Sequence, residues 1–184
     1  PQNIVTISAP FAGFVKSTEL LQGMTITKGQ LLAEMQHPDY IQFQQDYLET
    51  KGQLDFLEVE YKRQTELGKD SINSEKSLQQ AKANYFSALA KAQGLKAKLK
   101  LMNLDLAIVE KGEFSASMNL HSPIDGFVMD VQVNIGKYVL PTDPMFKIVN
   151  TRHLHAELRV FEKDVLNIHK GQIIDFTLGG DTTK

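Results

Sequence analysis

The chain has 184 residues, of which 42% are hydrophobic and 23% are charged, and its formal net charge at pH 7 is −2. This balance is typical of a globular protein and gives no long-range attraction to nucleic acid or anionic lipid, so we expect no nucleic-acid partner. The chain has no cysteine, which excludes disulfides, cysteine-ligated zinc and thiol catalysis. It also has no run of about 18 apolar residues, so we expect no membrane-spanning helix within it.

The first segment has the pattern of short strands separated by turns. Pro10 and Gly13 bracket a tight turn, because proline presets φ and glycine accepts a positive φ. Gly23 and Gly29 indicate further turns. Residues 1–36 are too few to bury a stable core alone, so we expect an unfolded peptide if they are expressed without a partner segment.

A seven-residue repeat follows and predicts two helices. Pro38 with Asp39 is a typical helix start, the first helix ends near Gly68, and Ser74 with Glu75 begins the second after a polar turn. Two such helices form an antiparallel coiled-coil hairpin whose arms reach roughly 40–50 Å. The expected inward-facing residues are Tyr40, Phe43, Tyr47, Thr50, Leu54, Leu57, Tyr61 and Gln64 in the first helix and Leu78, Ala81, Tyr85, Ala88, Ala92, Leu95, Leu99, Met102 and Leu106 in the second.

Two glycines lie inside the predicted helices, at mirrored positions about the turn. A helical glycine costs about 1 kcal/mol relative to alanine. Gly52 and Gly94 therefore indicate either a hinge or close crossing of the two arms, or two tolerated glycines.

The segment after the hairpin repeats the segment before it. Ile7–Val15 (ISAPFAGFV) returns 113 residues later as Leu120–Val128 (LHSPIDGFV), and the register continues without a gap, so that Gly23 falls on Gly136. We expect a half-buried strand over residues 131–135, ended by Gly136. The two copies, residues 1–36 and 115–150, are predicted to pack as one β-sandwich.

The last 34 residues, 151–184, form a third module. Alternation over 154–160 predicts a strand, Glu162–Val165 a helical turn, and Lys170–Gln172 a turn before a final strand. His153, His155 and Glu157 share one face of the first of these strands and are the one cluster suited to a divalent cation. We interpret this face as solvent-exposed and predict no metal site.

These elements predict a multi-module protein of mixed α and β class. Its parts are a β-sandwich over 1–36 and 115–150, an α-helical hairpin over 37–114 and the start of a β-barrel over 151–184. We expect the hairpin to be replaceable between about residues 41 and 108 without loss of the sandwich. No catalytic triad, phosphate loop or nucleotide fingerprint is present, so we predict no enzymatic activity and no cofactor.

The order of copy, hairpin, copy and barrel start resembles a known family. The duplicated motif resembles a lipoyl/biotinyl domain, and the whole arrangement resembles the periplasmic adaptors, or membrane fusion proteins, of bacterial tripartite efflux pumps. His37–Ile41 followed by Gln44–Leu48 is similar to the hairpin entry of adaptors that serve heavy-metal pumps of the resistance-nodulation-division class.

This resemblance implies an adaptor in the periplasm of a Gram-negative bacterium, anchored to the inner membrane by a segment outside this chain. It would link an inner-membrane transporter of the resistance-nodulation-division class, of cation type, to an outer-membrane channel, and would self-associate as a ring. Alternatives are an adaptor of a multidrug or ABC-type exporter, a biotin or lipoate carrier domain of an enzyme, and a scaffold unrelated to transport. The hairpin occupies the junction at which a carrier domain presents its modifiable lysine.

A second motif lies at the predicted hairpin tip. Adaptors that dock onto outer-membrane channels often carry an arginine, a leucine four residues on and a serine seven residues beyond it. Arg63, Leu67 and Ser74 match this spacing, which implies partner binding. The other interpretation is a solvated arginine and a serine that only caps the second helix.

Overall fold

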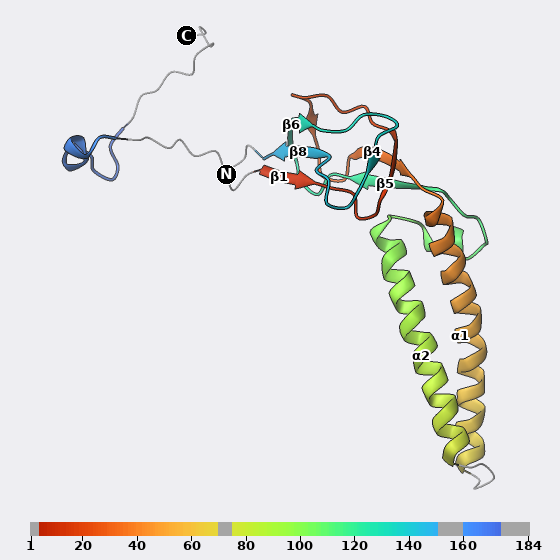
Figure 1. The fold of residues 1–184 in the computed structure, drawn as a ribbon. Helices are drawn as coiled ribbons and strands as arrows, with labels where there is room; N and C mark the ends of the chain where they lie inside the picture. Colours follow the sequence, from red (N-terminus) through yellow and green to blue (C-terminus); the bar gives the residue numbers. More distant parts are fainter. Residues whose placement is uncertain (1–3, 70–74, 151–159, 174–184) are drawn as a thin grey trace. The chain divides into compact units, whose positions relative to one another are not determined.

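The computed structural model describes residues 4–69, 75–150 and 160–173, and the chain divides into two compact units, residues 1–152 and 153–184. The first unit contains two four-stranded sheets and two long helices that lie side by side (Figure 1). This agrees with the predicted mixed class, in which a long helical hairpin is combined with β-sheets.

Every strand pair in the first unit is antiparallel. One sheet has the order β1-β8-β6-β3 and the other the order β5-β4-β2-β7. The strands span β1 Ile4–Ile7, β2 Gly13–Ser17, β3 Thr25–Ile26, β4 Leu31–Gln36, β5 Ser117–His121, β6 Gly126–Val131, β7 Tyr138–Val139 and β8 Phe146–Val149.

The two sheets have the same arrangement of strands. Each strand of one sheet corresponds to a strand of the other sheet that comes from the other copy of the repeat. Ile4 pairs with Val149 in the first sheet, and their equivalents Ser117 and Gln36 pair in the second. The β2–β4 pair and the β6–β8 pair also have equivalent registers. Each has an irregularity directly after the Phe-Val dipeptide of the repeat, between Val15 and Ser17 in one pair and between Val128 and Asp130 in the other. Because each sheet takes two strands from each copy, neither copy can complete a sheet alone.

Equivalent residues of the two copies have equivalent surroundings. Val15 and Val128 are each 1% exposed, whereas Phe14 and Phe127 are 48% and 39% exposed. The two copies of the repeat therefore present the valine to the core and the phenylalanine to the surface. Phe14 packs its ring against Tyr138 on the neighbouring strand, with centroids 4.9 Å apart.

The repeated glycines are explained by backbone geometry. Gly23 and Gly136 have φ values of 87° and 86°, a region that residues with a Cβ rarely adopt. Gly13 instead permits a close approach, because a Cβ there would lie 2.6 Å from the Tyr40 hydroxyl oxygen. A Cβ at Gly126 would meet the backbone of β8.

The strand predicted over residues 131–135 is wrong beyond its first residue. β6 ends at Val131, and Ile135 is 64% exposed. The chain turns there because the backbone N–H of Lys137 donates to Asn134 (3.1 Å) and Gly136 takes a positive φ. Val133 is buried, as the alternation indicated.

Helices α1 (Asp39–Lys69, 31 residues) and α2 (Glu75–Leu101, 27 residues) form the hairpin. At 1.5 Å per residue they are about 46 and 40 Å long. The expected inward-facing residues of both helices are all buried or half-buried. Leu106 lies outside α2, in the short helix α3 (Leu106–Val109).

The early end of α2 has a local cause. Asn103 has a φ of 55°, and the backbone N–H of Leu104 reaches back to the carbonyl of Leu99 (3.3 Å) while that of Asn103 reaches Lys100 (3.0 Å). This is the Schellman arrangement, in which a left-handed residue satisfies the last helical carbonyls. The heptad pattern continues past this point in sequence, so the predicted position of Leu106 in the second helix is wrong.

The close-crossing interpretation of the two helical glycines is also wrong. A Cβ built at Gly52 or Gly94 would have no atom within 4 Å beyond its own surroundings in the helix. Both glycines lie on exposed helix surface.

The hydrophobic core of the sheets continues into the base of the hairpin. Tyr40, Tyr47, Leu99 and Met102 belong to the same buried cluster as the inward-facing residues of both sheets. Tyr47, Leu99 and Met102 lie within 41–108, the range that we expected to be replaceable. The turns of α1 and α2 nearest the sheets are part of the core of the first unit.

In the second unit, a 3₁₀ helix spans Glu162–Asn167, and a turn follows in which Gly171 has a φ of 95°. The helical turn and the turn after it were both predicted. His153, His155, Glu157 and the two expected strands of this module lie outside the described residues. Among the helices that the structure describes, none combines the length and the apolar character needed to cross a bilayer.

Candidate docking site on the hairpin

The predicted tip residues lie near the end of α1 farthest from the sheets. Arg63 and Leu67 are one helical turn apart and both are exposed, Leu67 to 37%. A spacing of four residues places them on the same face of the helix. Ser74 lies outside the described residues, so the structure brings together two members of the predicted trio.

Three polar contacts around these residues join side chains of α1 to one another. The Arg63 guanidinium donates to Glu60, the Gln64 amide donates to the other oxygen of Glu60 (2.6 Å), and Lys62 pairs with Glu58 (2.5 Å). Exposed pairs of this kind contribute little to stability. The side chains at this end of α1 are therefore available to a partner without loss of the fold.

An aromatic cluster joins α1 to α2 just on the sheet side of the tip residues. Tyr61 of α1 stacks on Tyr85 of α2 with centroids 5.5 Å apart, and Phe86 packs edge-on against Tyr85 at 5.1 Å. Stacked and edge-on aromatic pairs stabilise a helix contact beyond their buried area. This cluster holds α1 and α2 in fixed register beneath Arg63 and Leu67.

At the base of the hairpin, one buried amide ties the chain entering the hairpin to the chain leaving it. Gln44 is 1% exposed. Its Nε2 donates to the carbonyls of Ser115 (2.7 Å) and Tyr40 (2.5 Å), and its Oε1 accepts from the backbone N–H of Ser115 (3.0 Å). Since residues 44 and 115 are 71 positions apart, this pair closes the hairpin at its base.

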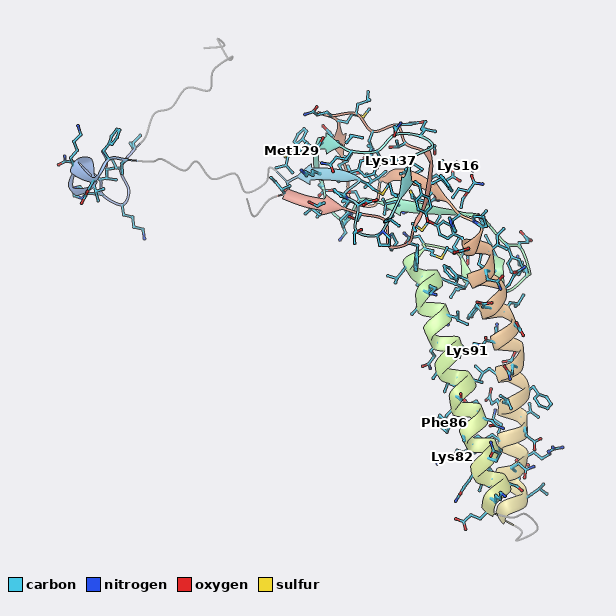
Figure 2. The ribbon with its side chains drawn as sticks, in the orientation of Figure 1. Lys16, Lys82, Phe86, Lys91, Met129 and Lys137 are labelled. Carbon is cyan, nitrogen blue, oxygen red and sulfur yellow. The ribbon has the colours of Figure 1, made fainter. Side chains whose placement is uncertain are left out.

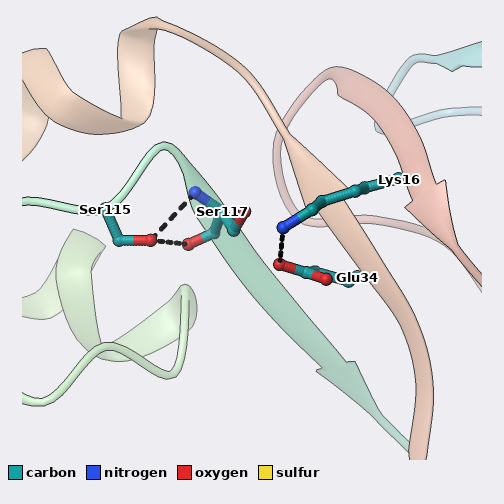
Figure 3. Close-up of polar contacts among 4 residues, drawn as sticks. All are labelled: Lys16, Glu34, Ser115 and Ser117. Carbon is teal, nitrogen blue, oxygen red and sulfur yellow. Dashed lines mark hydrogen bonds and ion pairs between the residues drawn. The ribbon is translucent and has the colours of Figure 1, made fainter.

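Ser115 is also fixed to the start of β5. Its hydroxyl oxygen accepts from the backbone N–H of Ser117 (3.0 Å) and lies 3.2 Å from the Ser117 carbonyl (Figure 3). On the neighbouring strand β4, Glu34 pairs with Lys16 of β2 at 2.8 Å (Figure 3). The Lys16 ammonium, followed by the Ser117 hydroxyl, lowers the pKa of Glu34 below its ordinary value.

A second clamp joins α1 to the residue that follows α3. The Tyr47 hydroxyl donates to Glu110 (2.9 Å), and Lys51 pairs with the other carboxylate oxygen (2.7 Å). Lys51 and then Tyr47 lower the pKa of Glu110. Burial and this hydrogen bond raise the pKa of Tyr47 to about 12.

Both helix ends at the base are anchored. The His37 ring accepts from the backbone N–H of Asp39 (3.2 Å) and so caps α1, while Tyr40 donates to the carbonyl of Ala12 (2.9 Å). The side chain of Asn103 donates to the carbonyl of Asn119 on β5 (3.1 Å). The hairpin is thus bonded to the sheets from both of its arms.

The role of the tip residues in docking stays a prediction, and sequence reasoning missed the roles of Gln44 and Glu110. Gln44 directly follows an inward-facing position of the repeat, and Glu110 lies among exposed polar residues, so neither has a distinguishing pattern. No group of three or more histidine or acidic side chains in the described part of the chain is arranged to hold a metal ion. The arrangement is an exposed helix end on a support that is fixed to the sheets.

Comparison with protein-family models finds no match. In sequence, the chain is 24% identical over 164 residues to the cobalt-zinc-cadmium resistance protein CzcB of Cupriavidus metallidurans, a match that covers 88% of this chain and 30% of the relative. The chain therefore spans less than a third of that relative's length.

Solved structures share the fold. ZneB from Cupriavidus metallidurans matches 92% of this chain and 69% of its own, with a TM-score of 0.53 and 22% identity. A MacA-MexA chimera that contains the Pseudomonas aeruginosa MexA α-hairpin matches 80% of this chain and 48% of its own, with a TM-score of 0.57 and 22% identity. The resemblance to periplasmic adaptors, including proteins named for cation efflux, is confirmed.

Proposed function

We propose that this chain is the hairpin-bearing part of a periplasmic adaptor that links an inner-membrane efflux transporter to an outer-membrane channel. The observation that carries the proposal is the architecture itself: a hairpin about 40 Å long is inserted between two copies of one half-motif, and it is clamped to the sheets at its base. Such a hairpin can extend to a partner about 40 Å from the sheets, and the clamps hold its base in a fixed position.

The two interleaved sheets support assignment as a lipoyl-like domain, with boundaries at 1–36 and 115–150 and the hairpin over 37–114. Residues 151–184 are proposed to begin a β-barrel domain. In this scheme the barrel side faces the transporter, and the protein is held at the inner membrane by a segment outside this chain.

The proposed cargo is a divalent cation, and the proposed transporter is of the resistance-nodulation-division class. The similarity to a protein named for cobalt, zinc and cadmium resistance supports this choice, and so does the hairpin-entry sequence His37–Ile41. The cation is cargo for the transporter, so no metal site is required on this chain.

The hairpin tip is the proposed docking surface for the channel. Arg63 and Leu67 are exposed on one face at the end of α1, and Ser74 is proposed to complete the surface. Copies are proposed to assemble side by side as a ring, so that several tips meet one channel.

The test is deletion of the gene, with complementation by the full-length protein. Cells that lack the protein should retain more zinc, cobalt or cadmium, measured as cell-associated metal, and the wild-type gene should restore the lower level. Unchanged retention of all three metals, with raised sensitivity to organic drugs, would reject the cation cargo and support the alternative of a multidrug exporter. No change in either phenotype would reject the role in export.

A further inference from the structure

The two helical glycines lie at the same height on the hairpin. The stacked rings of Tyr61 and Tyr85 show how the two helices are aligned. Gly52 precedes Tyr61 by nine residues, and Gly94 follows Tyr85 by nine residues. Because α1 and α2 run in opposite directions (Figure 1), both glycines lie about 14 Å from the stacked rings toward the sheets. A bend at one glycine therefore coincides with a bend at the other.

The contacts that hold the base of the hairpin extend as far as these glycines. On α1, Lys51 pairs with Glu110, and Gly52 is the next residue. On α2, Leu95 packs against the buried cluster that the hairpin shares with the sheets, and Gly94 is the residue directly before it. In the described part of the chain, each helix thus has its glycine immediately beyond its last contact with the base.

The base itself is braced from both helices. Phe43 of α1 packs against Phe11, which lies between β1 and β2, with ring centroids 5.8 Å apart. The ammonium group of Lys98 on α2 lies 4.0 Å from the centroid of the Phe43 ring. Together with the buried bonds of Gln44 to Ser115, these contacts would have to break if the hairpin tilted where it meets the sheets.

The segment of the hairpin between the glycines and the aromatic cluster is loosely packed; Lys91 lies in this segment of α2 (Figure 2). The buried side chains that α2 contributes here are alanines, Ala88 and Ala92. Two grooves of about 320 Å³ each open between the helices, one lined by Leu57 with Ala88 and the other by Leu54 with Ala92. Along this segment, no hydrogen bond or ion pair joins the described side chains of α1 to those of α2.

Beyond this segment the two helices are joined again by the aromatic cluster. The Phe86 ring lies 5.1 Å from the Tyr85 ring and 6.2 Å from the Tyr61 ring, in addition to the stack of the two tyrosines. Aromatic contacts of this kind stabilise a helix pair beyond the area that they bury. The far part of the hairpin is therefore held together as one body, and it carries Arg63 and Leu67.

No packing requirement of the fold explains the two glycines. A Cβ at either position would have open space around it, and both positions are exposed. A glycine inside a helix is less favourable than an alanine, because it loses more backbone freedom on folding. Sharp bends in helices are found at residues such as glycine and proline. Two opposed glycines between a braced base and a joined far part have the arrangement of a hinge.

We propose that the hairpin bends at the level of Gly52 and Gly94 while its base stays fixed to the sheets. The part beyond the glycines moves as one body and changes the direction in which Arg63 and Leu67 point. α1 continues for about 25 Å beyond Gly52, so a bend of about 20° moves its end by roughly 9 Å. This inference rests on the docking role of the tip in the proposed function, and it adds how the tip is aimed at its partner.

Distances between two nitroxide spin labels, measured by double electron–electron resonance, test the bend directly. The chain has no cysteine, so labels attach only at introduced cysteines. Thr6→Cys places one label on β1 and Glu66→Cys places the other on α1 beyond the glycines; both positions are exposed. We expect a broad distance distribution for this pair, and one at least twofold narrower after Gly52→Ala with Gly94→Ala. An equally broad distribution without the glycines would overturn the proposal.

Two controls locate the bend and its cause. With Gln45→Cys in place of Glu66→Cys, both labels lie on the sheet side of the glycines, so we expect a narrow distribution. A Thr6 and Gln45 pair as broad as the Thr6 and Glu66 pair would place the motion where the hairpin meets the sheets and overturn the proposal. Gln53→Ala with Gln93→Ala changes the exposed neighbours of the two glycines and should leave the broad distribution unchanged. Equal narrowing by this control would assign the effect to helix propensity and reject the role of the glycines.

In cells, the full-length protein with Gly52→Ala and Gly94→Ala should be more stable and export less metal. We expect a higher Tm and at least twofold more cell-associated zinc, cobalt or cadmium than with wild type, whereas Gln53→Ala with Gln93→Ala should match wild type. A higher Tm with unchanged export is the result of a purely structural role, and it would overturn the use of the bend in docking. If deletion of the gene changes no metal retention, the export role is wrong, and the spin-label distances in the purified chain still decide whether the hairpin bends.

Discussion

Replacement of the buried amide at the hairpin base tests how the hairpin is joined to the sheets. Gln44→Ala removes three hydrogen bonds made by a side chain that is 1% exposed. Each such bond contributes about 1 kcal/mol net, so we expect the free energy of unfolding to fall by about 2–3 kcal/mol. For a domain of this size, this corresponds to a Tm lower by roughly 4–12 °C.

The adjacent residue supplies the control. Gln45 is exposed, so Gln45→Ala should change stability by less than about 0.5 kcal/mol. Both substitutions make the same change in helix propensity, so the difference between them isolates the buried contacts. The measurement is thermal unfolding followed by circular dichroism. Equal Tm values for the two variants would refute the claim that Gln44 clamps the hairpin base.

Four further predictions concern glycines, pH, the hairpin base and the tip. Gly52→Ala and Gly94→Ala should each raise the free energy of unfolding by about 0.5–1 kcal/mol, because a Cβ has open space at both positions. Gly13→Ala should lower the free energy of unfolding by about 1–3 kcal/mol, because its Cβ meets the Tyr40 hydroxyl. The pKa of Glu34 is lowered in the folded chain, so its stabilising contribution is present above the unfolded pKa of about 4.3 and is lost as pH falls through the lower folded pKa. The Tm difference between wild type and Glu34→Gln should therefore shrink as the pH falls below the unfolded pKa, with Glu113→Gln as the exposed control. Replacement of residues 51–94 by a short turn should leave cooperative unfolding, whereas replacement of 41–108 should abolish it, because Leu99 and Met102 belong to the shared core. The double variant Arg63→Asp, Leu67→Asp should keep its free energy of unfolding within about 0.5 kcal/mol of the wild-type value and should lose metal export. Wild-type export by this variant would show that the tip does not dock.

The architecture could be predicted because it depends on local patterns that survive in the sequence. The repeat identifies the equivalent positions of the two copies. Gly23 and Gly136, for example, are equivalent, and both have a positive φ. The heptads fix the helix faces, since inward residues such as Tyr47 and Ala88 are buried. Arg63 and Leu67 could be located because the motif falls at a predicted helix end.

What could not be predicted depends on contacts between distant segments. The end of α2 is set by Asn103, whose side chain bonds to β5, whereas the heptad pattern continues past it. The strand over 131–135 failed because alternation does not show where a chain leaves its partner strand. Gln44 and Glu110 act through partners many residues away, and no local pattern distinguishes such residues from exposed ones.

The most direct measurement of the adaptor role uses the full-length protein with residues 51–94 replaced by a short turn. This change removes the docking tip and most of the hairpin but keeps Tyr40, Gln44, Leu99 and Met102 at its base. We predict wild-type protein levels, unchanged association with the inner-membrane transporter, loss of the outer-membrane channel from the purified complex, and raised cell-associated zinc, cobalt or cadmium. Retention of the channel and of normal metal export by this shortened protein would contradict the account.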